Sequence, residues 1–296
     1  MKRLEKPIIV IGPGRTGSTI ISEIVFAHHE LGGPTNYSEW QPKLPWLSAL
    51  TRLSNNDLWW ISGEKAQQQK TRFLNNYVPR PAEAWSLWQN MTRSDIDFSR
   101  DFLLYKRASE TEKQTIRHTF DAMLKLQGKQ RLALKLTGPA RLEYLHSIFP
   151  DAYFINIVRE PTATVTSLLN TPFWQQQGAK QLWWHGAYSK KELNTYNAIA
   201  RNPVAGTAFQ LNKILTTTKE EQARVKANML TIHYEQFLSN PKYAIHSIMS
   251  FCHLSNDQRI DQKLEQTGFS NRQLTNQLES TSRETIERWC PAKLAC

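Results

Sequence analysis

The 296-residue chain has little cysteine and no long apolar run. Its three cysteines, Cys252, Cys290 and Cys296, are an odd number and form no C-x-x-C pair, which argues against a disulfide framework and a zinc site. The longest purely apolar run is only a few residues, far below the roughly 20 that a transmembrane helix needs. Met1 is not followed by the apolar segment of a signal peptide. We therefore expect a soluble, cytoplasmic protein without a transmembrane segment.

The sequence also lacks the residues with which a P-loop enzyme holds a nucleoside triphosphate and its metal. Gly12, Gly17 and Thr19 have the spacing of the G-x-x-x-x-G-K-[ST] motif, but Ser18 stands where the motif has lysine. The later apolar runs lead into Thr, Arg or Glu rather than into the aspartate that helps to hold Mg²⁺. A metal-dependent triphosphate site is therefore a poor fit, although backbone N–H groups at a helix N-terminus still suit one phosphate-like group.

Short apolar runs and helical patterns alternate along most of the chain. Strands are predicted at 8–11, 131–136, 153–158 and 229–233. Helices are predicted from residue 18 to about 29, from a capping box at 109–112 to Gly128, and at 139–149, 161–170, 205–223 and 241–253. This order predicts an α/β fold with a parallel β-sheet flanked by helices, of P-loop nucleotide-binding type. Because no repeat or low-complexity linker interrupts the pattern, we expect one domain over residues 1–296.

Residues 34–108 interrupt this alternation of strands and helices, and no strand is predicted in them. They hold six of the ten tryptophans, together with several prolines, and are predicted to form an insertion of helices and loops. Flat indole rings suit sugar rings, phenols or apolar chains, so the insertion is expected to face an acceptor molecule. The alternative is that these tryptophans pack the insertion's own core.

A second candidate phosphate site lies in the segment "FINIVREPTATVTS". The predicted strand at 153–158 delivers Arg159 at its carboxyl end, which is the ligand side of a parallel sheet. Ser167 follows eight residues later, about two turns along the next helix. Two phosphate sites without metal ligands point to 3′-phosphoadenosine 5′-phosphosulfate (PAPS).

These pieces together resemble the PAPS-dependent sulfotransferase family, of the P-loop type that includes bacterial and carbohydrate sulfotransferases. The resemblance is carried, in the right order and over about half of the chain, by "GPGRTGST", "ALKLTGPARLEYLHSIFPDA", "FINIVREPTATVTS" and "LTIHYEQFLSNPKYAIHSIMSFCHL". It implies an EC 2.8.2 type enzyme that moves a sulfuryl group from PAPS to a hydroxyl or, less favoured, an amine. The released product would be adenosine 3′,5′-bisphosphate, and no metal would be needed.

The resemblance also implies roles for individual residues. The 5′-phosphosulfate would lie on Gly14, Arg15, Thr16, Gly17, Ser18 and Thr19, while Arg159 and Ser167 would bind the 3′-phosphate. Arg15 and Lys135 would stabilise the charge that develops during transfer. In some relatives the general base is a glutamate 20 to 30 residues after the loop, which makes Glu39 the first candidate for this role. Others use a histidine two residues after the lysine, where this chain has Thr137.

Other candidates for the base are single histidines. His185, in "LWWHG", ranks after Glu39, and His28 and His29 rank behind it. A single histidine is more often structural than catalytic, and Glu39 has the equally weighted alternative of an ordinary exposed loop carboxylate.

Two other function classes stay open at this point. A degenerate P-loop kinase or NTPase would need the missing lysine and metal acid. A polyanion-binding module would use the formal charge of +11 but would leave the paired motifs unexplained. The basic residues are scattered, so we expect a small-molecule or carbohydrate acceptor as partner and no nucleic acid. The oligomeric state cannot be read from the sequence.

Overall fold

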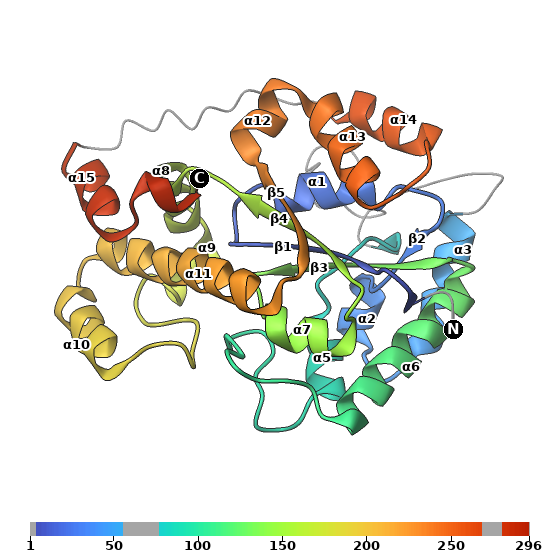
Figure 1. Ribbon diagram of the computed structural model, residues 1–296, viewed down its shortest axis with the longest axis horizontal. Helices are drawn as coiled ribbons and strands as arrows, with labels where there is room; N and C mark the ends of the chain where they lie inside the picture. Colours follow the sequence, from blue (N-terminus) through green and yellow to red (C-terminus); the bar gives the residue numbers. More distant parts are fainter. Residues whose placement is uncertain (1–3, 56–76, 268–279, 296) are drawn as a thin grey trace.

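The computed structural model describes residues 4–55, 77–267 and 280–295 of the chain. Its centre is a five-stranded sheet in the order β2-β3-β1-β4-β5 (Figure 1). All neighbouring strands run parallel, and their bounds are β1 (Ile8–Gly12), β2 (Leu31–Gly32), β3 (Arg131–Thr137), β4 (Tyr153–Val158) and β5 (Asn228–His233). The predicted parallel α/β fold is confirmed.

The register brings the carboxyl ends of the central strands together at one edge of the sheet. Gly12 of β1 stands opposite Thr137 of β3, and Ile11 stands opposite Asn156 of β4. Every residue of β1 is buried, as expected for a strand covered on both faces. Loops that follow β1, β3 and β4 therefore meet at the same edge.

Helices cover both faces of the sheet, and alternate residues of β1 face the two layers. Ile8 and Val10 pack in one cluster with α1 (Ser18–Val25), α13 (Pro241–Phe251) and α14 (Gln258–Gln266). Ile9 and Ile11 pack in the other with α5 (Trp85–Met91), α6 (Glu110–Gln127) and α7 (Leu142–Ile148). Figure 1 shows α1, α13 and α14 on one side of the sheet and α5 to α7 on the opposite side.

A further group of helices packs beside the carboxyl ends of the strands (Figure 1). It contains α8 (Pro161–Leu169), α9 (Pro172–Gln176), α10 (Lys190–Ile199), α11 (Pro203–Val225) and α15 (Ser280–Trp289), followed by the 3₁₀ turn η3 (Ala292–Ala295). Their shared core joins residues of β4, α8, α11 and α15, among them Val158, Val165, Leu211 and Ile286. The short helix α12 (Tyr234–Ser239) follows β5 directly.

Several boundaries agree with the sequence signals. The Ser109 hydroxyl accepts a hydrogen bond from the Glu112 amide at 3.2 Å, and the Glu112 carboxylate accepts one from the Ser109 amide at 2.8 Å. Gly128 ends α6 in the left-handed conformation, with φ of 69°. The predicted capping box and glycine stop of this helix are confirmed.

Other elements were wrongly placed or not predicted. The helix predicted to reach about residue 29 ends at Val25, and the one predicted from 139 begins at Leu142. Strand β2 has two residues, too few to show periodicity. Helix α10 was not predicted, although Ser189 and Glu192 form a capping box at its start. Helices α14 and α15 were not predicted because they consist mostly of polar residues.

The insertion at 34–108 contains only short helices in its described part: α2 (Asn36–Trp40), η2 (Pro45–Leu50), α3 (Thr51–Ser54) and α5. Its described tryptophans differ in burial, and Trp85 is half-buried. Trp88 is fully buried and stacks on Phe98, while Trp40 and Trp46 are exposed. Trp59 and Trp60 lie outside the described residues. In the described ranges, no helix is both long and apolar enough to cross a membrane.

Candidate active site

The loop between β1 and α1 has a backbone that depends on glycine at two positions. Gly12 has φ of 145°, and a Cβ there would collide with the Ile157 carbonyl. Gly17 has φ of 85° at the N-cap of α1, and a Cβ there would collide with the Tyr234 ring. Because Gly17 offers no side-chain cap, the first N–H groups of α1 stay available for an anionic ligand.

Lys135 comes from β3 and reaches this loop from the side. Its ammonium donates to Thr19 Oγ1 at 3.1 Å, and only 6% of its side chain is exposed. Val10 of β1 is its register partner, so Lys135 lies on the face of the sheet that α1 covers. The structure therefore brings the predicted lysine into contact with the predicted phosphate loop.

Arg15, Ser167 and Arg159 also meet at this edge of the sheet. Arg15 Nε donates to Ser167 Oγ at 3.1 Å, and Arg159 Nη1 donates to the Arg15 carbonyl at 3.2 Å. The Arg159 guanidinium lies 5.0 Å from the centre of the Tyr234 ring. Burial raises the pKa of the Tyr234 phenol, and its ring makes a cation–π contact with Arg159. The two predicted phosphate sites are thus neighbours, joined through Arg15.

A cleft of about 450 Å³ opens beside Arg15 and the start of α1, a volume within the range of small-molecule sites. Arg159 and Ser167 are not among the residues that line it. On one part of its wall lie Gly14, Arg15, Ser18, Thr19 and Lys135. Another part is aromatic and consists of Trp85, Phe173, Trp174, Trp183 and Trp184. Trp184 packs closely on Gly138, where a Cβ would come within 2.8 Å of the indole nitrogen, so the aromatic wall reaches the end of β3.

Glu83 lines the same cleft and was not predicted as a site residue. Its Oε1 accepts a hydrogen bond from Thr137 Oγ1 at 2.8 Å and lies 3.5 Å from the Lys135 ammonium. Glu83 stands in the irregular segment "PRPAEAW", which has no pattern that would mark it. Only its contacts with β3 identify it.

Glu39 and His185, the predicted candidates for the base, do not line this cleft. The Glu39 carboxylate accepts hydrogen bonds from the Ser86 amide at 3.0 Å and its hydroxyl at 2.8 Å, which ties α2 to the first turn of α5. His185 is exposed, and its Nε2 accepts a hydrogen bond from Arg100 at 2.8 Å. Its neighbour Trp184 is the residue of "LWWHG" that enters the cleft wall with Trp183.

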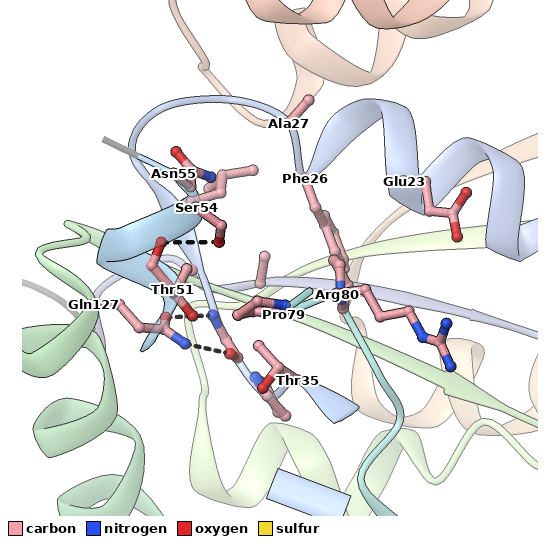
Figure 2. Close-up of a pocket in the computed structure, with 16 residues that line it drawn as sticks. Glu23, Phe26, Ala27, Thr35, Thr51, Ser54, Asn55, Pro79, Arg80 and Gln127 are labelled. Atoms are coloured by element: carbon pink, nitrogen blue, oxygen red, sulfur yellow. Dashed lines mark hydrogen bonds between the residues drawn. The ribbon is translucent and has the colours of Figure 1, made fainter. Parts of the chain in front are cut away.

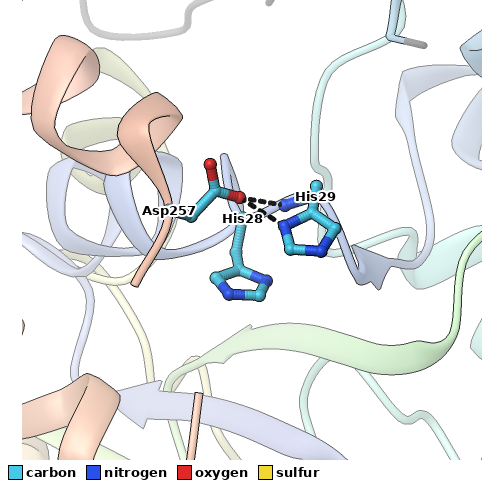
Figure 3. Close-up of side chains that lie close together, drawn as sticks. All are labelled: His28, His29 and Asp257. Atoms are coloured by element: carbon cyan, nitrogen blue, oxygen red, sulfur yellow. Dashed lines mark hydrogen bonds and ion pairs between the residues drawn. The ribbon is translucent and has the colours of Figure 1, made fainter. Parts of the chain in front are cut away.

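His28 and His29 form a separate cluster with Asp257 (Figure 3). His28 Nε2 donates to the Ser255 carbonyl at 3.1 Å, its Nδ1 accepts from the Glu30 amide at 3.3 Å, and burial lowers its pKa. Asp257 accepts from the His29 amide at 2.6 Å and from its Nδ1 at 2.8 Å. Since both ring nitrogens of His28 have partners, this cluster is a hydrogen-bonded clip that holds the start of α14.

A second, smaller cavity of about 60 Å³ lies between α1, α3 and the edge of the sheet (Figure 2). Gln127 closes one side, since its Nε2 donates to the Gly33 carbonyl at 2.7 Å and its Oε1 accepts from the Gly33 amide at 3.0 Å. Thr35, Pro79 and Arg80 line another part of its wall. These residues belong to the segments that lead to Glu83.

The parallel α/β fold, with a glycine-containing loop at a helix N-terminus and basic residues around it, has the arrangement of proteins that bind anionic ligands at the carboxyl ends of their strands. Residues 7–258 match the model of the sulfotransferase family. The chain therefore belongs to the sulfotransferase family, which identifies it as a transferase of sulfuryl groups.

Solved structures agree on the fold. The sulfotransferase STF1 from Mycobacterium tuberculosis H37Rv superposes with a TM-score of 0.53 at 15% identity, over 97% of this chain and 77% of that one. The sulfotransferase STF9 from Mycobacterium avium superposes with a TM-score of 0.52 at 15% identity, over 88% and 67%. No curated protein has a significant sequence match to the chain.

Proposed function

We propose that the protein transfers the sulfuryl group of PAPS to a hydroxyl group of a small molecule or carbohydrate. The observation that carries this proposal is the meeting of Lys135, Arg15, Arg159 and Ser167, from three strand ends and the following loops and helix, around the start of α1. Members of the sulfotransferase family generally use PAPS. A ligand with phosphate groups at both ends of a ribose matches this distribution of donors.

The donor would bind through two sets of contacts. The 5′-phosphosulfate would lie on the amides of residues 14–19, with the hydroxyls of Ser18 and Thr19 and the ammonium of Lys135 as further donors. The 3′-phosphate would take Arg159 and Ser167. Because Arg15 donates to Ser167 at 3.1 Å, a 3′-phosphate at Ser167 would compete with this hydrogen bond and turn Arg15 toward the reacting end.

The proposed reaction is one in-line displacement. The acceptor oxygen attacks sulfur, the new S–O bond forms, and the bond from sulfur to the 5′-phosphate oxygen breaks with its electron pair. Adenosine 3′,5′-bisphosphate leaves, the acceptor becomes a sulfate ester, and its hydroxyl proton passes to a base. Lys135 and Arg15 would stabilise the negative charge that develops on the leaving phosphate.

This chemistry assigns no step to a metal ion. The loop has Ser18 in place of the lysine of an NTPase, and β1, β3 and β4 lead into no aspartate. The cations at the leaving group would instead be Lys135 and Arg15. The aromatic wall of Trp85, Phe173 and Trp183 would receive the acceptor, since flat rings pack on sugars, phenols and apolar chains.

The first test is calorimetric binding of adenosine 3′,5′-bisphosphate compared with ATP and Mg²⁺. The wild-type protein should bind the bisphosphate without metal, and Arg159→Ala should weaken this binding by at least tenfold. Arg201→Ala, which removes one exposed positive charge outside the cleft, is the matched control and should bind normally. Binding of ATP with Mg²⁺ but not of the bisphosphate would refute the proposal in favour of a degenerate kinase.

A further inference from the structure

The general base is the catalytic role for which the sequence named no residue of the cleft, since neither Glu39 nor His185 lines it. We propose that it is Glu83, whose carboxylate takes the proton of the acceptor hydroxyl as the oxygen attacks sulfur. This inference rests on the proposed function and names a catalytic residue within it. The proton moves from the acceptor oxygen to a Glu83 oxygen, and the electron pair of the broken sulfur–oxygen bond leaves with adenosine 3′,5′-bisphosphate.

The position of Glu83 between the two parts of the cleft supports this role. Its Oε1 lies 3.5 Å from Lys135, which itself contacts Thr19 of the phosphate loop. It also lines the cleft together with Trp85 and Trp184 of the aromatic wall. A hydroxyl that approaches the sulfur from the aromatic side would therefore pass the Glu83 carboxylate.

The residues that line the cleft offer little competition for this role. Among the lining residues in the described part of the chain, Glu83 is the one carboxylate, and none is a histidine. Glu39 holds Ser86 at the start of α5, and His185 lies exposed beside Arg100. Neither group lies on the cleft wall between Lys135 and the aromatic residues.

The backbone that carries Glu83 is held firmly, as a catalytic group requires. The Asn36 amide donates to the Arg80 carbonyl at 3.1 Å, the Arg80 amide donates to Asn36 Oδ1 at 3.0 Å, and the Ala82 amide donates to the Pro34 carbonyl at 3.1 Å. Figure 2 shows Thr35, Pro79 and Arg80 from these two segments, where they line the smaller cavity. Directly after Glu83, Ala84 caps α5 in the left-handed conformation.

Thr137, at the end of β3, orients the Glu83 carboxylate. Its hydroxyl donates to Glu83 Oε1 at 2.8 Å. Strand β3 thus holds a carboxylate from the insertion beside Lys135. When a donor phosphate takes Lys135, the carboxylate would be released from its ion pair and could accept the hydroxyl proton.

The test compares Glu83→Gln, Glu83→Asp and Glu39→Gln with the wild-type enzyme. Turnover of ³⁵S-labelled PAPS is measured with 4-nitrophenol, 2-naphthol, N-acetylglucosamine and 1-octanol, and with water alone as acceptor. Water is present in every assay, so donor consumption gives a readout whichever organic acceptor is used. Calorimetric binding of adenosine 3′,5′-bisphosphate is measured on each variant in parallel.

We expect Glu83→Gln to lower kcat by about 100-fold or more, the usual effect of losing a general base, while the bisphosphate Kd stays within about threefold. Glutamine can still accept the Thr137 hydrogen bond, so the fold should be kept. Glu83→Asp should retain part of the activity, and Glu39→Gln should stay within about threefold of wild type.

The opposite outcomes are distinct. If Glu83→Gln keeps kcat within threefold, or if Glu39→Gln alone loses 100-fold, Glu83 is not the base. If Glu83→Gln weakens bisphosphate binding more than tenfold, Glu83 positions the donor instead, and the proposal is again wrong. A wild-type protein that neither binds the bisphosphate nor consumes PAPS would instead refute the proposed function.

Discussion

The ion pair of Lys135 and Glu83 gives the sharpest prediction about this site. Their charged atoms lie 3.5 Å apart, with 6% and 16% of the side chains exposed. Two unit charges at this distance attract by about 5 kcal/mol in an effective dielectric constant of about 20. Desolvation and lost side-chain freedom oppose this attraction, so we expect a net coupling of about 2 to 3 kcal/mol.

The perturbation is a double-mutant cycle of Lys135→Met and Glu83→Gln. Lys135→Met leaves the Glu83 carboxylate with the hydrogen bond from Thr137, and removal of one member of a buried pair costs about 3 to 5 kcal/mol. Glu83→Gln leaves the ammonium with Thr19 and is expected to cost less. The double variant should be more stable than the sum of the two single losses by the coupling energy.

Thermal unfolding followed by circular dichroism measures this effect. At roughly 2 °C per kcal/mol for a chain of this size, Lys135→Met should lower Tm by roughly 6 to 10 °C. The double variant should then lie about 4 to 6 °C above the additive value. The reasoning is refuted if the two substitutions add to within about 0.5 kcal/mol, because the groups would then not interact in the folded protein.

Four further variants probe separate features. Ser167→Ala should weaken binding of adenosine 3′,5′-bisphosphate about tenfold in calorimetry, since a hydrogen bond to a charged group is lost, and should leave adenosine 5′-phosphate binding unchanged. Gly17→Ala forces a side chain into the Tyr234 ring at a φ of 85° and should lower both Tm and bisphosphate affinity. Ser109→Ala removes the cap of α6 and should lower Tm by about 2 °C, for a loss of about 1 kcal/mol, without changing turnover of PAPS. Burial lowers the pKa of His28, so the unfolded chain binds its proton first and stability should fall as the pH drops below about 6.5; His28→Gln should flatten this part of the Tm profile.

Each of these expectations has a clear contrary result. If Ser167→Ala weakens the binding of both nucleotides equally, Ser167 does not bind the 3′-phosphate. Normal binding by Gly17→Ala would show that the loop tolerates a side chain. A large loss of PAPS turnover in Ser109→Ala would contradict the purely structural role given to the cap of α6. If the Tm of His28→Gln falls below pH 6.5 as steeply as that of the wild type, His28 does not cause the loss of stability at low pH.

Much of the fold could be predicted because its signals are local. The apolar run of β1, the glycine turn and the helical spacing of α1 lie within 18 consecutive residues, from Ile8 to Val25. Strand β4 matches its predicted bounds, and α8 was predicted to within one residue of its end. The same locality makes residues 14–19, Arg159 and Ser167 readable as candidates, since each follows directly on a strand or lies in the helix after it.

Long-range contacts have no such signal. The Thr137–Glu83 hydrogen bond joins residues 54 positions apart, and the Arg15–Ser167 bond joins residues 152 positions apart. Glu39 has a suitable spacing from the loop, yet its side chain is directed to Ser86 by the packing of α2 on α5. Spacing along the chain does not determine which carboxylate a folded insertion turns toward β3.

Local sequence patterns were enough to predict the parallel α/β sheet, the glycine-containing loop before α1 and the resemblance to sulfotransferases. Residue periodicity, capping and glycine placement act over a few neighbouring residues and are written directly in the chain. No local pattern shows that Glu83 lies beside Lys135, that Arg15 contacts Ser167, or that Trp183 and Trp184 rather than His185 line the cleft. These contacts depend on how helices and loops pack on the sheet, which is a property of the whole folded chain.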